Sequence, residues 1–169
     1  MNVLNKTLIS SLVRFLPTKR IVMLKQYQSL SPLFLRLAMG AGFMAHGWAK
    51  LSRGTGGFEK LLAQTGVPFA HVNAWIVPFV ELLGGLALLV GAFVVVVSVP
   101  LIISMLVAMF TVQIHYGFSS VKTIGLTPAG PLFGPPGYEI NLLYIAALVS
   151  LMITGAGKYS IDGLRERRG

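Results

Sequence analysis

The sequence predicts an all-α membrane protein, a bundle of four transmembrane helices preceded by an amphipathic helix at the membrane surface. Charged residues make up only 11% of its 169 residues and hydrophobic residues 54%, whereas soluble globular domains carry about 25% charged residues. A chain so poor in charge cannot cover a water-exposed surface. An uncharged run also covers residues 82–121, which is about twice the length that one helix needs to cross a ~30 Å hydrocarbon core.

The net charge of +9 would suggest nucleic-acid binding in a soluble protein, but most of these cations lie near the two ends of the chain. They are Lys6, Arg14, Lys19, Arg20, Lys25, Lys158, Arg165, Arg167 and Arg168. Basic ends around apolar spans follow the positive-inside pattern and suit anionic lipid headgroups. We therefore expect membrane lipids as partners and no nucleic acid. The predicted location is a bacterial inner (plasma) membrane, with both termini in the cytoplasm.

The four spans are expected at residues 32–50, 75–97, 100–118 and 140–157. Proline disfavours helical geometry in the residue before it, so Pro100 predicts the break between the second and third spans at Ser98–Pro100. Arg36 interrupts the first span. A long cationic side chain near a helix end can reach the membrane surface, so we expect Arg36 to contact lipid phosphates.

The same pattern divides the chain into three parts. Residues 1–30 form a basic amphipathic segment at the membrane surface, 31–158 form the membrane domain, and 159–169 form a basic cytoplasmic tail. The connections 51–74 and 119–137 then face outward. The stretch "GPLFGPPG" within the second connection holds three prolines and three glycines, which predicts an irregular loop.

Five ionisable side chains are predicted to lie in the outer third of the bilayer: His46, Lys50, Glu81, His115 and Glu139. A charge at mid-bilayer costs at least about 2.5–3.5 kcal/mol, so such groups normally face the interior of the bundle and pair. Lys50 or a histidine is the expected partner of Glu81 or Glu139. The i, i+4 spacing places His46 and Lys50 on one helical face.

Each of these residues also has a purely structural interpretation, and both interpretations stay open. Lys50 can anchor a helix at the interface, and His115 can be an ordinary boundary residue. Glu139 can simply suit a helix N-terminus, and Glu81 can belong to a structural ion pair. The glycines Gly84 and Gly85 would let another helix approach Glu81 closely.

The sequence points to no resident metal and no covalently bound cofactor. It contains no cysteine, which excludes disulfides, iron–sulfur ligation and thiolate zinc sites. Two histidines at one depth could bracket a haem, and two histidines with two glutamates could hold a metal. No spacing in the chain supports either arrangement.

Five short stretches give the chain a resemblance to the DoxX family of small four-helix membrane proteins. They are "HGWAKL" (46–51), "PFVELLGGLALLVG" (78–91), "IHYGF" (114–118), "GYEINLLYIAALVSL" (137–151) and "GAGKYSIDGL" (155–164). They occur in family order between residues 31 and 164. The family pattern usually has proline at the position of Ala156, and the first thirty residues lie outside the resemblance.

This resemblance implies a link to membrane redox chemistry, because the family is named after a subunit of an archaeal thiosulfate:quinone oxidoreductase. The leading hypothesis is a small subunit of a membrane redox assembly that is not an enzyme on its own and contacts quinone or quinol. His46, Lys50 and His115 would bind the quinone, and Glu81 and Glu139 would transfer protons. Its partners would be other membrane protein subunits.

Two other functions remain open. One is a non-catalytic accessory subunit that assembles a larger complex, in which the polar residues stabilise the interior. The chain could also carry a small molecule or lipid, although it lacks the paired broken spans that transporters often show. Fold likeness alone does not decide between these functions.

Overall fold

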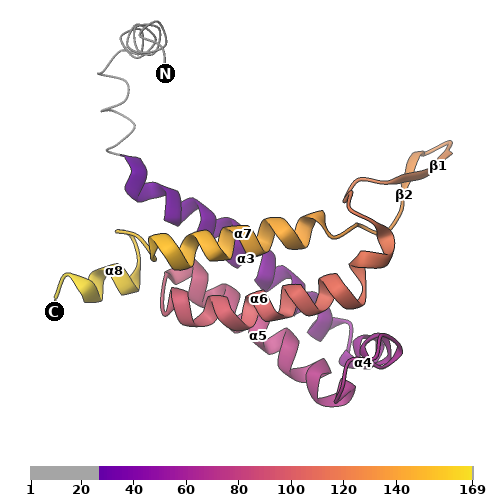
Figure 1. The fold of residues 1–169 in the computed structure, drawn as a ribbon, viewed down its shortest axis with the longest axis horizontal. Coiled ribbons are helices and arrows are strands. Elements are labelled where there is room, and N and C mark those ends of the chain that lie inside the picture. Colours follow the sequence, from indigo (N-terminus) through magenta and orange to yellow (C-terminus); the bar gives the residue numbers. More distant parts are fainter. Residues whose placement is uncertain (1–26, 169) are drawn as a thin grey trace, which may run out of the picture.

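The computed structural model describes residues 27–168, which are mostly helical (Figure 1). The elements are η1 (Gln28–Leu30), α3 (Ser31–Ser52), α4 (Thr55–Gln64), α5 (Ala70–Val90), α6 (Val94–Thr111), η2 (Gln113–Tyr116), β1 (Thr123–Thr127), β2 (Gly130–Phe133), α7 (Glu139–Thr154) and α8 (Ile161–Glu166). Residues 1–26 of the amphipathic segment predicted at 1–30 lie outside the described residues.

Four helices pack side by side in a ring. Helix α3 packs on α5, α5 on α6, α6 on α7, and α7 back on α3 (Figure 1). Fully buried apolar side chains from all four helices fill the centre of the ring: Phe43, Leu88, Leu101, Leu148 and Leu151. The helices coincide broadly with the four predicted spans, and the outward faces of the ring carry large exposed apolar side chains.

Within residues 27–168, two helices are long and apolar enough to cross a membrane, α5 and α6. Helix α7 is also apolar but has 16 residues. Helix α3 is longer, with 22 residues, and carries Arg36, His46 and Lys50. Long apolar helices with exposed apolar faces are typical of a membrane protein.

The turn between α5 and α6 lies at residues 91–93, and the predicted break at Ser98–Pro100 is wrong. Gly91 and Phe93 both adopt left-handed backbone conformations, with φ of 69° and 52°. The carboxylate of Asp162 accepts hydrogen bonds from the backbone N–H groups of Phe93 and Val94, both at 2.9 Å. This distant cap satisfies the start of α6, while Pro100 is tolerated inside the helix.

Glycines bring α3 and α5 into close contact. A Cβ atom on Gly47 would lie 2.6 Å from the carbonyl oxygen of Pro78, and one on Gly85 would lie 2.7 Å from that of Gly40. Neither position therefore has room for a side chain. The predicted close approach at Gly84 and Gly85 is confirmed, with α3 facing Gly85 and Leu101 of α6 facing Gly84.

Both connections contain regular structure that the sequence did not predict, so the fold is not strictly all-α. The first connection contains α4. The second contains an antiparallel hairpin in which Thr127 pairs with Gly130, and Leu126 pairs with Pro131. The expectation of an irregular loop at 130–137 is wrong for 130–133, because Gly130 turns at a φ of 123° and Pro131 sits in a two-stranded sheet, where each strand is an edge.

The ring has two distinct ends (Figure 1). The basic end holds the start of α3, the α5–α6 turn and α8. Asp162 N–H donates to Gly91 O at 3.0 Å and the Arg36 guanidinium donates to Tyr159 O at 2.6 Å, which fixes α8 there. The hairpin end holds α4, η2, β1 and β2.

Candidate functional site

An ion pair between Lys50 and Glu81 forms the centre of the candidate site. The ammonium nitrogen of Lys50 lies 2.6 Å from Glu81 Oε1 and 2.5 Å from Oε2. The Glu81 side chain is 1% exposed and that of Lys50 is 26% exposed. Lys50 and Glu81 approach closely because α3 and α5 are in direct contact there. Gly47 lies one turn before Lys50 and packs directly against the backbone of α5 beside Glu81. Of the pairings that the sequence left open, the structure contains Lys50 with Glu81.

Ser104 of α6 provides a further hydrogen bond to the Glu81 carboxylate. Its hydroxyl donates to Glu81 Oε1 at 3.1 Å, so three helices meet at this one side chain. Neutral hydroxyls are common in membrane helices, and nothing in the sequence distinguished Ser104 from the other serines of the chain.

The Lys50 ammonium retains hydrogen-bonding capacity toward the hairpin end. An ammonium group carries three N–H donors, and the two oxygens of Glu81 are the hydrogen-bond acceptors of Lys50 among residues 27–168. The ring centre of Phe58, on α4, lies 5.0 Å from the nitrogen. The ammonium is thus held between a buried carboxylate and an aromatic ring, with one donor to spare.

The other three predicted site residues are not in contact with the ion pair. His46 is exposed, and its ring centre lies 6.3 Å from that of Tyr144 on α7. His115 is exposed in η2. Glu139 is partly buried at the start of α7 and accepts a hydrogen bond from the Ser120 N–H at 2.9 Å.

Of the five predicted residues, Lys50 and Glu81 are in contact and the other three lie apart from them. His46 precedes Lys50 by about one turn on α3 but lies beside Tyr144 of α7, while His115 lies in η2 and Glu139 at the start of α7. Across residues 27–168, no three histidine, aspartate or glutamate side chains are grouped so that they could hold a metal ion.

A second polar group of the interior, Asn141 of α7, was missed by sequence reasoning. It is 1% exposed, and its amide nitrogen donates to Met105 O at 3.2 Å and Gln113 Oε1 at 3.5 Å. Its Oδ1 atom has no hydrogen-bond partner within the described part of the chain. Asparagine is neutral, so hydropathy and charge patterns gave no sign of it.

Arg36 occupies a different position from the one predicted. It does not extend to the membrane surface: it is fully buried and donates to the carbonyl oxygens of Leu88, Leu89 and Tyr159. These carbonyls belong to the end of α5 and to the segment before α8. Because left-handed Gly91 ends α5 beside Arg36, the guanidinium has carbonyl partners inside the protein and does not need lipid phosphates.

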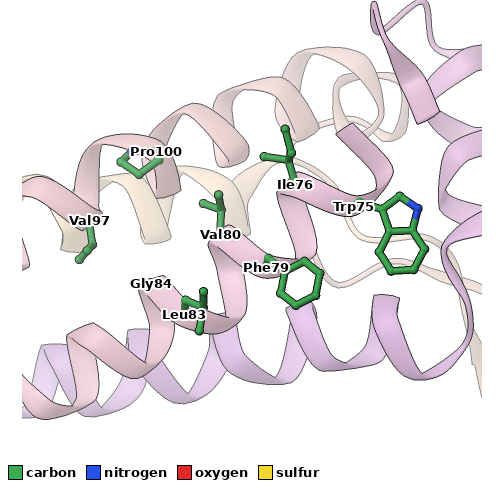
Figure 2. Close-up of a pocket in the computed structure, with 8 residues that line it drawn as sticks. All are labelled: Trp75, Ile76, Phe79, Val80, Leu83, Gly84, Val97 and Pro100. Atoms are coloured by element: carbon green, nitrogen blue, oxygen red, sulfur yellow. The ribbon is translucent and has the colours of Figure 1, made fainter. Parts of the chain in front are cut away.

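A groove of about 470 Å³ opens on the outer surface where α5 meets α6 (Figure 2). Its walls include Trp75, Ile76, Phe79 and Leu83 of α5, with Val97 and Pro100 of α6. The lining is apolar. Glu81 projects from α5 into the interior of the ring, whereas these side chains line the outer surface, so the groove is separate from the ion pair.

Comparison with known proteins gives one family. The DoxX family model matches residues 31–114, from the start of α3 into η2. No curated protein and no solved structure matches the chain. The matched region includes Lys50, Glu81 and Ser104, and it ends before α7 and α8.

Proposed function

The chain belongs to the DoxX family of membrane proteins, and we propose that it is a small four-span subunit of a membrane redox assembly that binds quinone or quinol at Lys50. In this proposal the protein holds no redox centre of its own. Electrons come from a partner subunit, while this chain binds and orients the quinone and supplies protons.

The packing of the ring supports four crossings. Helix α3 has 22 residues, which gives about 33 Å at the usual helical rise and is long enough for a ~30 Å hydrocarbon core. Helix α7 packs between α3 and α6, which favours a common depth for all four helices. Lys158, Arg165, Arg167 and Arg168 at the basic end favour a cytoplasmic location for that end, in a bacterial inner membrane.

The observation that carries the quinone proposal is the remaining donor of Lys50. A quinone oxygen is a hydrogen-bond acceptor, and Lys50 offers a charged donor to it at the edge of the apolar layer. The ring of Phe58 provides an aromatic face beside the same nitrogen. Glu81 fixes the ammonium in position, which orients the donor before the ligand arrives.

Proton transfer is assigned to the carboxylates. Glu81, which contacts the Lys50 ammonium, exchanges a proton with the quinone through Lys50. Glu139 lies apart from the pair, bonded to the Ser120 N–H, and would take this role only for a quinone bound near the start of α7. His46 and His115 would contact the quinone ring only if it extended from Lys50 toward α7 or η2. Lys50 is therefore the primary ligand-binding residue of this proposal.

The test is the quinone content of the protein after extraction in mild detergent. Wild type should retain quinone, and Lys50→Met should retain about tenfold less, because a charged hydrogen bond contributes on the order of 1.5–3 kcal/mol. The exposed Lys122→Met is the matched control and should behave as wild type. If wild type binds no quinone and Glu81→Gln supports normal redox activity in its assembly, the proposal is wrong.

The second candidate is an accessory subunit that stabilises a larger membrane complex without catalysis. It is favoured by the complete pairing of Glu81, since Lys50 donates to both carboxylate oxygens and Ser104 donates to Oε1. On this account Glu81→Gln lowers the abundance of the complex and leaves turnover per complex unchanged. Normal abundance with lost turnover would instead favour the quinone site.

A further inference from the structure

Helix α8 is fixed against the ring at the basic end and is not a free tail. Asp162 caps α6 through Phe93 N–H and Val94 N–H, and its own N–H donates to Gly91 O. The buried Arg36 donates to Tyr159 O just before α8. The Ser160 hydroxyl caps α8 by accepting from Gly163 N–H at 2.9 Å. Together these contacts fix the backbone of α8 against the ring.

The exposed side of this segment is strongly basic. Four exposed cations lie within eleven residues: Lys158, Arg165, Arg167 and Arg168. The exposed acid among them is Glu166, while the carboxylate of Asp162 is already engaged with the start of α6. A net positive charge therefore remains on this surface.

Aromatic and aliphatic side chains lie among these cations. The Arg165 guanidinium lies 4.8 Å from the ring centre of Phe93, and the Lys158 ammonium lies 5.9 Å from that of Tyr159. Phe93, Tyr159 and Leu164 are all more than half exposed. Cations mixed with aromatic rings are typical of the level of a membrane where headgroups meet acyl chains.

We infer that this basic surface, formed by Lys158, Arg165, Arg167 and Arg168 with Phe93 and Tyr159, binds the headgroups of anionic phospholipids. Lys and Arg would contact the phosphates, while the rings would enter the boundary with the acyl chains. The contacts of Asp162 and Arg36 hold the surface in place, so the cations are arranged before lipid binds. This site is at the opposite end of the ring from Lys50 and does not depend on the quinone proposal.

Anionic lipid fits this surface better than a soluble anion does. A soluble phosphate would gain nothing from the exposed rings of Phe93 and Tyr159. A lipid in the bilayer satisfies the cations and covers the apolar side chains at the same time. The basic end is also the end predicted to face the cytoplasm, where anionic lipids attract clustered cations.

The experiment uses the full chain in mild detergent after lipid removal. Phosphatidylglycerol, phosphatidylcholine and glycerol phosphate are each titrated, with the melting temperature and the lipid retained on the protein as readouts. Phosphatidylglycerol should bind and raise the melting temperature, while phosphatidylcholine and glycerol phosphate should not. The effect should weaken in 1 M salt, where the Debye length is about 3 Å.

Two triple variants decide the location of the site. K158Q/R165Q/R168Q spares Arg167, whose guanidinium caps the end of α8 through Gly163 O, and it should weaken phosphatidylglycerol binding at least about tenfold. The control R53Q/K60Q/K122Q removes three exposed cations elsewhere and should bind as wild type. Equal binding by the first variant, equal loss in the control, or an equal effect of glycerol phosphate would each overturn the inference.

Discussion

Glu81 is held in the interior of the ring by groups from three helices. A carboxylate in an apolar interior is stable as an ion only if it is paired and hydrogen-bonded. Lys50 provides the opposite charge and Ser104 a further donor, so both oxygens are satisfied. The charge that the sequence marks as most unfavourable in a membrane helix is thus the point at which α3, α5 and α6 are joined.

Removing Lys50 should lower the stability of the protein more than removing Glu81. Lys50→Met leaves Glu81 buried with Ser104 alone, and we expect a loss of about 3 kcal/mol in stability, as for other buried pairs that lose one partner. Glu81→Leu should be milder, because Lys50 is 26% exposed and can turn toward the hairpin end. The double variant K50M/E81L should recover most of the loss. Melting temperatures in detergent measure all three, with Lys122→Met as the control.

Additive losses in the double variant would contradict this description of the pair. They would mean that Lys50 and Glu81 contribute independently to stability and that the short distances between them carry no coupling.

Charge pattern and spacing placed Lys50 and Glu81 among the possible partners but did not choose between Lys50 and a histidine, or between Glu81 and Glu139. A buried charge in an apolar helix must have a partner, and few charges were present to provide one. Ser104 and Asn141 are neutral, so hydropathy does not separate them from residues that face lipid or backbone. Arg36 was misassigned because its partners are backbone carbonyls, and a sequence contains no sign of which carbonyls remain free.

The turn between α5 and α6 is formed by a glycine and a distant cap. Gly91 ends α5 in a left-handed conformation, and Asp162 satisfies the first N–H groups of α6 from about seventy residues further along the chain. Local sequence rules favoured Pro100 as the break because the proline is adjacent in sequence, whereas Asp162 becomes adjacent only in the folded chain. Helix existence was therefore predictable here, and helix boundaries were not.

Substitutions at Pro100 and Gly91 should show which of the two residues ends the helix between α5 and α6. Pro100→Ala should leave the protein folded and should not lower its melting temperature, because alanine is a better residue than proline inside a helix. Gly91→Ala should destabilise it by on the order of 1–2 kcal/mol or more, since a Cβ there meets Arg36 and Ser160 and the backbone is left-handed. A larger loss for P100A than for G91A would show that the break lies at the proline.

The close packing of α3 against α5 at Gly47 can be tested in the same way. A Cβ on Gly47 would lie 2.6 Å from Pro78 O and 2.8 Å from Leu82 N, both backbone atoms that cannot move aside. Gly47→Ala should separate the helices and lower stability by about 1–3 kcal/mol. Gly56→Ala is the control, because nothing lies within 4 Å of its Cβ and alanine favours the helix by about 1 kcal/mol. Equal melting temperatures for the two variants would contradict the close packing.

The protein as a whole has polar groups at both ends of the ring and an apolar surface between them. The Lys50–Glu81 pair lies toward the hairpin end, and the cations of α8 lie at the basic end. The repeated apolar runs predicted four helices, and the structure contains all four as neighbours in the ring. The hairpin and α4 were not predicted, because short polar connections rich in glycine and proline carry little periodic signal.

Single-cysteine labelling in intact cells tests the proposed topology. In that topology the chain crosses the membrane four times, with α4 and the hairpin on the outer side and α8 in the cytoplasm. The chain contains no cysteine, so a thiol reagent reports only the residue introduced. Gly56→Cys, Ala129→Cys and Arg168→Cys place thiols at exposed positions on α4, at the hairpin turn and after α8. We expect an impermeant reagent to label the first two in intact cells and to label Arg168→Cys only after the membrane is opened. Labelling of Gly56→Cys and Arg168→Cys from the same side would contradict the crossing of the membrane by this ring and, with it, the placement of the quinone and lipid sites on opposite faces.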